Sequence, residues 1–124
     1  MEEGVLEEVT RAGGNMANKF RAIVVLVTCK SPAEARRIAL ALVRKRMAAC
    51  GNFQSTPVAS IYRWKGSVES AKETLLILKT TRNRFRKLEK EIRRLHSYQV
   101  PEIIALPIIS GSRKYLNWLA ENVR

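Results

Sequence analysis

Two uninterrupted apolar runs, residues 22–29 and 74–78, constrain the fold of this chain more than any other feature. Both have the length of a strand, are rich in Val, Ile and Leu, and lack the alternation of a half-exposed strand. Each run is followed by a segment whose apolar residues recur at helical spacing. We therefore expect two central strands buried on both faces, with one helix after each strand.

The first predicted helix opens with Ser31-Pro32-Ala33-Glu34, a capping box with proline at the first helical position. This helix is expected to end near Cys50. Its apolar face comprises Ala35, Ile38, Ala39, Leu42, Val43 and Met47. The second predicted helix stops at His96. Its apolar side comprises Phe85, Leu88, Ile92 and Leu95.

Two further strand-like stretches, residues 58–64 and 68–80, are joined by Lys65-Gly66, which favours a tight hairpin turn. A strand over residues 102–109 and a short helix after Gly111-Ser112 complete the order βαββαβ plus a C-terminal helix. This order predicts an α+β, ferredoxin-like sandwich with an extended hairpin.

The chain of 124 residues has room for one domain of ordinary size. Residues 1–20 carry four glutamates and lack a sustained apolar period, so we expect an acidic, flexible N-terminal tail. Residues 21–124 are expected to form the single domain.

The charge is strongly basic, with 23 Lys and Arg against 11 Glu, no aspartate, and a formal net charge of +12. Such a chain attracts polyanions, anionic metabolites or acidic surfaces. A solvated basic face that keeps the protein in solution explains the same charge equally well. Both interpretations stay open at this point.

Two cysteines and no signal-peptide pattern give no sign of a disulfide scaffold or of export, which favours a reducing compartment. No apolar run is long enough to span a bilayer. We therefore expect a cytoplasmic protein that does not enter the membrane.

The predicted topology brings three chemically distinct side chains to one end of the sheet. Cys29 closes the first strand, His96 ends the second helix and Glu102 begins the last strand. A set of sulfur, nitrogen and oxygen donors suits copper or zinc. A histidine at a helix end is also a common cap for the last carbonyls, and this alternative stays open. Cys50 should lie at the opposite end, too far away for an intrachain disulfide.

Several classes of function find no support in the residues. One histidine and no aspartate cannot form a Ser/His/Asp triad, and no phosphate-binding glycine motif is present. We therefore expect no enzymatic activity. RNA-recognition domains of this fold class need aromatic residues on two central strands, and the two apolar runs contain none, so no specific nucleic-acid partner is expected.

Aromatic residues gather outside the two apolar runs. A domain of this size would not bury all of them beside its aliphatic core, so we expect some to face a partner. The candidate interface residues are Tyr62, Trp64, Tyr98 and Trp118.

Five ordered motifs resemble the CutA family, the divalent-cation tolerance proteins. They are residues 46–52 (RMAACGN), 60–66 (SIYRWKG), 76–81 (LILKTT), 95–107 (LHSYQVPEIIALP) and 115–119 (YLNWL). The resemblance implies a ferredoxin-like subunit in a homotrimer like that of the PII proteins, and a role in tolerance of copper and other divalent metal ions. It puts the family's candidate metal ligands at His96 and Glu102, with a thiol from the end of the first strand. The alternative is a PII-like sensor that binds an anionic metabolite, a nucleotide or an acidic protein in a basic cleft between subunits.

Overall fold

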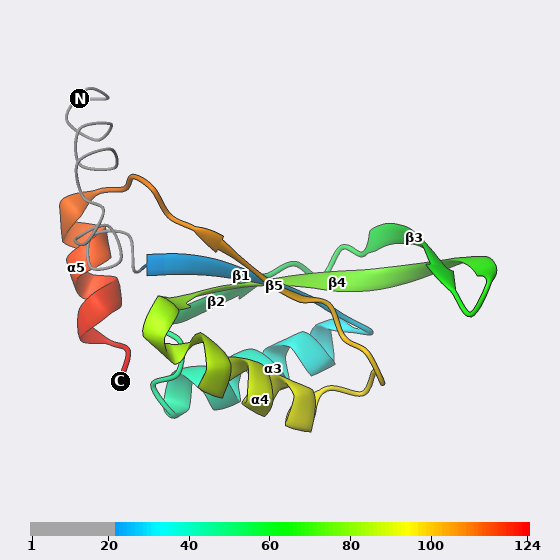
Figure 1. Ribbon diagram of the computed structural model, residues 1–124, viewed down its shortest axis with the longest axis horizontal. Coiled ribbons are helices and arrows are strands. Elements are labelled where there is room, and N and C mark those ends of the chain that lie inside the picture. Colours follow the sequence, from blue (N-terminus) through cyan, green and yellow to red (C-terminus); the bar gives the residue numbers. More distant parts are fainter. Residues whose placement is uncertain (1–21) are drawn as a thin grey trace.

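The computed structural model describes residues 22–124 (Figure 1). The predicted acidic tail, residues 1–20, lies outside the described residues. Along the chain the elements are β1 (Ala22–Cys29), α3 (Pro32–Arg44), β2 (Cys50–Phe53), β3 (Val58–Trp64), β4 (Ser67–Thr81), the 3₁₀ turn η1 (Arg82–Arg84), α4 (Phe85–Leu95), β5 (Ile103–Pro107) and α5 (Arg113–Glu121).

The strands form one antiparallel sheet in the order β2-β4-β1-β5, and β3 pairs with the outer part of β4. This arrangement confirms the predicted α+β, ferredoxin-like class. Helices α3 and α4 lie together on one face of the sheet (Figure 1).

The first helix ends earlier than predicted. It stops at Arg44, and Arg46 takes a positive φ of 59°, which no helix continues through. Cys50 therefore begins a short strand, β2, which the sequence does not predict because Gly51 and Asn52 are poor strand formers. Gly51 fits here because a Cβ atom would lie only 3.0 Å from Cβ of Ala39 on α3.

The hairpin between β3 and β4 turns where the sequence predicts. Lys65 and Gly66 have φ values of 48° and 85°, and Trp64 pairs directly with Ser67 across the two-residue turn. Strand β4 is 15 residues long, and its outer part pairs with β3 alone. The hairpin consequently extends well beyond the helix-covered part of the sheet (Figure 1).

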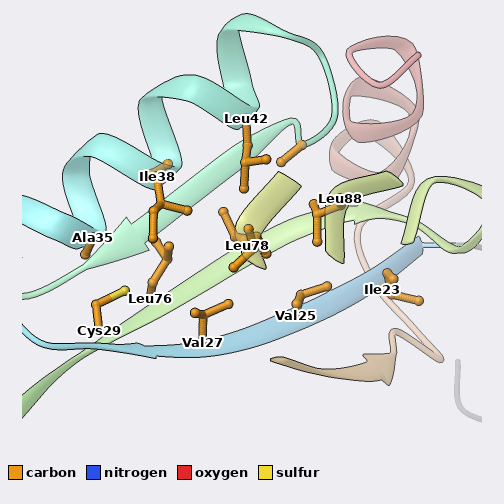
Figure 2. Close-up of a cluster of buried hydrophobic side chains, with 13 residues drawn as sticks. Ile23, Val25, Val27, Cys29, Ala35, Ile38, Leu42, Leu76, Leu78 and Leu88 are labelled. Atoms are coloured by element: carbon orange, nitrogen blue, oxygen red, sulfur yellow. The ribbon is translucent and has the colours of Figure 1, made fainter. Parts of the chain in front are cut away.

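The main core lies between the sheet and the two helices. Ile23, Val25, Val27 and Cys29 point from β1 toward α3 and meet Leu76 and Leu78 of β4 (Figure 2). On the helix side the buried residues include Ala35, Ile38, Leu42, Leu88 and Ile92.

The expectation that both faces of β1 are buried is wrong for the single chain. Val24, Leu26 and Thr28 alternate with the core residues and are only partly buried. Leu26 pairs with Ile104 and Val24 with Leu106, and these two β5 residues are about half exposed. No element in residues 22–124 covers this second, apolar face, which we call the open sheet face: Val24, Leu26, Leu75, Ile77, Ile104 and Leu106.

Helix α5 packs at the start of β1, where Leu119 contacts the small cluster of Ala22 and Ala49. The amide nitrogen of Arg124 donates a hydrogen bond of 2.8 Å to the carbonyl oxygen of Arg46. This bond holds Arg124 beside the turn that follows α3. None of the helices in the described part of the chain has the length and apolar character needed to cross a bilayer.

Candidate functional site

Three donor groups meet at the far end of β1. The Cys29 thiol, a Glu34 carboxylate oxygen and a ring nitrogen of His96 lie within 4.8 Å of one another, and all three residues are buried. Cys29 ends β1, Glu34 belongs to the first turn of α3, and His96 caps α4. The structure thus brings Cys29 and His96 together as predicted, with Glu34 beside them.

Both ring nitrogens of His96 are hydrogen-bonded to the backbone. The amide of Tyr98 donates to Nδ1 at 3.1 Å, so Nδ1 is an acceptor. The proton of the neutral ring is therefore on Nε2, which donates to the Thr28 carbonyl oxygen at 2.8 Å. The histidine fastens the end of α4 to β1.

Glu34 joins two loops from inside the protein. Its carboxylate accepts the amide of Lys30 at 2.9 Å and the amide of Ser97 at 2.8 Å, and Arg37 lies 3.6 Å away. Burial acts to raise the pKa of Glu34, but these N–H donors outweigh burial and hold the pKa below its ordinary value. The carboxylate therefore stays charged.

The Cys29 thiol is protonated at neutral pH. Burial, followed by the negative charges of Glu34 and Glu73, raises its pKa to about 12. Thiolate is the form that binds metal ions, so this site must lose a proton before the sulfur can act as a ligand.

The donor types and the spacing of this cluster fit a soft divalent ion such as copper or zinc. Each donor nevertheless already has another partner, because the thiol holds a proton, the imidazole binds the backbone at both nitrogens and the carboxylate accepts two amides. Binding would require these bonds to be exchanged.

Glu102, the third predicted ligand, is not part of the group of three. It is exposed and lines a neighbouring cavity of about 760 Å³ between the hairpin and the loop after α4. Thr28, Glu73 and Tyr98 line the same cavity, so its inner wall adjoins the buried cluster. The role of Glu102 as a ligand stays a prediction.

Inside this cavity the Tyr98 hydroxyl donates to Oε2 of Glu73 at 2.7 Å. Burial, together with this bond and the charge of Glu73, raises the pKa of Tyr98, so the phenol remains a donor. Glu73 is only 7% exposed. It sits where β4 leaves the main sheet, since Glu73 pairs with Val58 of β3 and the next residue pairs with Cys29 of β1.

The two cysteines are far apart and free, as predicted. Cys29 pairs with Thr74 and Cys50 with Lys79 of the same strand β4. This register separates them by roughly 16 Å along β4 and about 10 Å across it. A disulfide needs Cα atoms within about 7 Å, so the two thiols of one chain cannot pair.

The predicted interface residues divide between two ends of the molecule. Tyr62, Trp64 and Tyr98 line the cavity, and the first two are 44% and 40% exposed. Trp118 lies on α5 at the opposite end of β1, where its ring centroid is 5.4 Å from that of Tyr115 and the two rings are tilted by 38°. Their role in an interface stays a prediction.

Sequence patterns alone do not mark Glu34 and Glu73 as site residues. The capping box accounts for Glu34, and the Ser31 hydroxyl does accept the Glu34 amide at 3.1 Å. Glu73 directly precedes the second apolar run, and a charged residue at the edge of a central strand was the signal that could have marked it.

Relatives of this chain bear the names of different compartments. A 41% identical protein of Arabidopsis thaliana is called "Protein CutA, chloroplastic"; the match covers 82% of this chain and 56% of that longer protein. A solved structure from Archaeoglobus fulgidus, 37% identical with a TM-score of 0.79 over 83% of this chain and 99% of that one, is titled a periplasmic divalent cation tolerance protein. These names contradict the predicted cytoplasmic location. Two cysteines that cannot pair suit an oxidising compartment as well as a reducing one, so they do not identify the compartment.

The sequence and the fold agree on one family. The model of the CutA1 divalent ion tolerance protein matches residues 23–122. A "Divalent-cation tolerance protein CutA" of Thermus thermophilus is 52% identical over 99 residues, 80% of this chain and 95% of that protein. A solved structure of the divalent cation tolerance protein from Thermus thermophilus superposes with a TM-score of 0.80 at 50% identity, over 83% of this chain and 99% of that one. The chain belongs to the CutA1 family of divalent ion tolerance proteins.

Proposed function

We propose that this protein binds a divalent metal ion, with copper as the foremost candidate, at the end of β1 as part of divalent-metal tolerance. The observation that carries the proposal is the meeting of thiol, imidazole and carboxylate within 4.8 Å, from three separate elements. The names of its relatives, divalent-cation tolerance proteins, support the same role.

Cys29 and His96 are the proposed soft ligands, and Glu34 is the carboxylate nearest to them. Glu102 remains a candidate ligand from the side of the cavity. Sulfur and nitrogen donors favour copper and zinc over magnesium and calcium, which take oxygen ligands. We therefore expect the site to select for soft ions.

We propose a homotrimer as the working assembly. The continuous apolar runs predict strands buried on both faces, yet helices cover one face and the open sheet face stays uncovered in residues 22–124. Two further copies of the chain would bury that face and the aromatic residues of the hairpin, Tyr62 and Trp64.

A binding role, and not catalysis, is proposed for this site. The one histidine of the chain holds both ring nitrogens in backbone hydrogen bonds, so it offers no unengaged base. The alternative of an anionic ligand in a basic cleft has less support, because the cavity beside the cluster is lined by two glutamates and by no Lys or Arg from the described residues.

Titration calorimetry with Cu²⁺, Zn²⁺ and Mg²⁺ tests the proposal. The parent protein should bind Cu²⁺ and Zn²⁺ saturably and Mg²⁺ weakly. Cys29→Ser should weaken Cu²⁺ binding by more than about tenfold, since it removes a soft ligand. Cys50→Ser is the matched control, because it removes the other thiol, which pairs with Lys79, five residues along β4 from the partner of Cys29. Equal affinities of Cys29→Ser and the parent would refute the proposed site.

A further inference from the structure

The positive charge of the chain is concentrated on its two main helices. Residues 32–46 and 82–95, which comprise α3, the turn after it, η1 and α4, carry twelve Lys and Arg and three Glu, a formal net charge of +9. The other 74 described residues carry eight Lys and Arg and four Glu, a formal net charge of +4. Charge that only keeps a protein in solution has no reason to gather in one region, so this concentration favours a negatively charged partner.

The basic side chains of α4 point away from the core. Leu88 and Ile92 are fully buried against the sheet. Arg86, Lys90 and Arg93 recur at spacings of four and three residues and are exposed, so they form a row on the outer side of the helix.

Helix α3 adds a second row beside the first. Arg36 and Arg44 are exposed, and together with Leu40 they line an open groove of about 460 Å³ that no acidic residue of the described structure lines. An ion pair between Lys45 and Glu91 links the end of α3 to α4 and holds the two rows side by side. We call this surface the basic helix face: Arg36, Arg44, Arg86, Lys87, Lys90 and Arg93.

No carboxylate of the described structure neutralises the basic helix face. The ion pairs among residues 22–124 involve three other cations, Arg37, Lys45 and Arg94. Like charges gathered on one surface repel one another, and a polyanion that lies over them removes this repulsion. The basic helix face is thus complementary to a row of negative charges.

The same face stays accessible in the proposed trimer. Helices α3 and α4 cover the side of the sheet opposite to the open sheet face (Figure 1). Further copies of the chain would bury the open sheet face and leave the helices outside. A large partner could therefore reach the basic helix face of every subunit.

The residues around these charges favour a nucleic-acid duplex over other polyanions. Proteins that bind single strands stack the bases on exposed aromatic rings, but the one aromatic residue of the two segments, Phe85, packs against the core. Helices that bind membranes insert several large apolar side chains, and here Leu40 and Val43 are only 39% and 37% exposed.

The spacing of the two rows favours DNA. The axes of packed helices lie roughly 8–10 Å apart, and the major groove of B-DNA is about 12 Å wide with one phosphate strand on each side. The major groove of an RNA duplex is narrow and deep. Arginine, which provides four of the six cations of the basic helix face, binds phosphate through two parallel hydrogen bonds.

We propose that the basic helix face binds the phosphate backbone of double-stranded DNA without sequence preference, with the α4 row on one strand and the α3 row on the other. This function goes beyond the proposed metal binding and uses none of its candidate ligands, so each can fail without the other.

Fluorescence anisotropy of a short labelled DNA duplex, titrated with the full chain, tests the proposal. Binding should be saturable in 50 mM NaCl and weaken more than about 100-fold in 200 mM NaCl, the salt dependence of about four phosphate contacts. Two duplexes of unrelated sequence should bind equally, and a single strand or an RNA duplex of the same length more weakly. Equal or tighter binding of either of the last two would overturn the assignment to double-stranded DNA.

A membrane surface is the competing partner. The full chain is therefore also sedimented with vesicles of phosphatidylserine and phosphatidylcholine in the same buffer. We expect little of the chain to sediment with them. Absence of saturable duplex binding in 50 mM NaCl would overturn the proposal, and sedimentation with the vesicles in that case would identify the face as a membrane-binding surface.

A triple variant with Arg86→Gln, Lys90→Gln and Arg93→Gln removes the α4 row. Its affinity for the duplex in 50 mM NaCl should fall by about tenfold or more, and the slope of log affinity against log salt should become shallower by about 0.9 for each lost contact. Cys29→Ser, which removes a proposed metal ligand, should bind the duplex like the parent.

The matched control removes the same charge from α5 and the chain end, with Arg113→Gln, Lys114→Gln and Arg124→Gln. These side chains are exposed and make no ion pair within residues 22–124, as is true of the α4 row, so both triple variants should fold. The control should keep most of the affinity of the parent. Equal losses in the two triple variants would show that net charge alone drives binding, and the proposed face would be wrong.

Discussion

Nε2 of His96 donates a hydrogen bond of 2.8 Å to the carbonyl oxygen of Thr28, and this bond joins the end of α4 to the end of β1. The amide of Tyr98 closes a second bond on the same ring at Nδ1. In the metal-free protein the imidazole therefore stabilises the fold by linking α4 to β1, independently of any role as a metal ligand. A substitution of His96 is therefore expected to affect both the stability of the fold and the binding of metal.

Replacing His96 by Ala should destabilise the protein even without metal. The change leaves the Thr28 carbonyl and the Tyr98 amide without their partner, at an expected cost of about 1–3 kcal/mol in the free energy of unfolding. Denaturant unfolding in the presence of a chelator measures it. An unchanged midpoint would mean that the two bonds of His96 contribute nothing, and loss of metal binding in this variant could then be assigned to the missing ligand alone.

The two thiols should differ sharply in reactivity. Cys29 is fully buried with a pKa of about 12, whereas Cys50 is partly exposed. Because thiolate is the nucleophile, iodoacetamide at pH 8 should label one cysteine per native chain, and that residue should be Cys50. Mass spectrometry of the labelled peptides identifies it. Faster labelling of Cys29 than of Cys50 would contradict the burial of the cluster.

The ion pairs of Glu91 should make stability depend on acid. Hydrogen bonds from Arg94 and then Lys45 lower the pKa of Glu91 to about 2 from an ordinary value of 4.5. A carboxyl with a lowered pKa in the folded state stabilises the protein above pH 4.5, and this contribution disappears as the pH falls through about 2.

Glu91→Gln should therefore lower the melting temperature at pH 7, and its difference from the parent should vanish toward pH 2. The partners are about half exposed, so the loss should stay below about 1 kcal/mol and shrink in 1 M salt. Glu89→Gln on the same helix serves as the control. A difference that persists unchanged at pH 2 would show that the ion pairs are not its source.

Assembly should depend on the open sheet face. Ile104 is 48% exposed in the single chain, so Ile104→Lys should not unfold it, but a charge there should break a trimer apart. Sedimentation equilibrium should give three times the 14.1 kDa chain mass for the parent and a smaller mass for the variant. Leu40→Lys, at a similarly exposed position on the outer face of α3, should remain trimeric. A parent protein that sediments as a single chain would refute the assembly.

Local sequence signals predicted much of this fold because they act over a few residues. The capping box at Ser31 and the two left-handed residues at Lys65-Gly66 fix their turns without help from distant parts of the chain. Strand β2 could not be predicted in this way. Its four residues form a strand because the edge of β4 offers hydrogen-bond partners and because Gly51 lets α3 approach closely.

The candidate site was predictable only in part, because it also depends on contacts between residues far apart in the sequence. Chain topology alone brings Cys29 and His96 to one end of the sheet. Which carboxylate joins them depends on side-chain direction, and Glu34 turns inward because the amides of Lys30 and Ser97 bind it. Glu102 points to the cavity side instead. No spacing rule in the sequence distinguishes these two glutamates.

X-ray absorption spectroscopy of the zinc-loaded protein tests the metal site most directly, because it reports which atoms bind the ion. We expect one sulfur ligand at about 2.3 Å from the zinc and an imidazole nitrogen at about 2.0 Å. The sulfur shell should disappear in Cys29→Ser and persist in Cys50→Ser. A shell of oxygen and nitrogen alone, identical in the parent and in Cys29→Ser, would contradict a metal site at the end of β1.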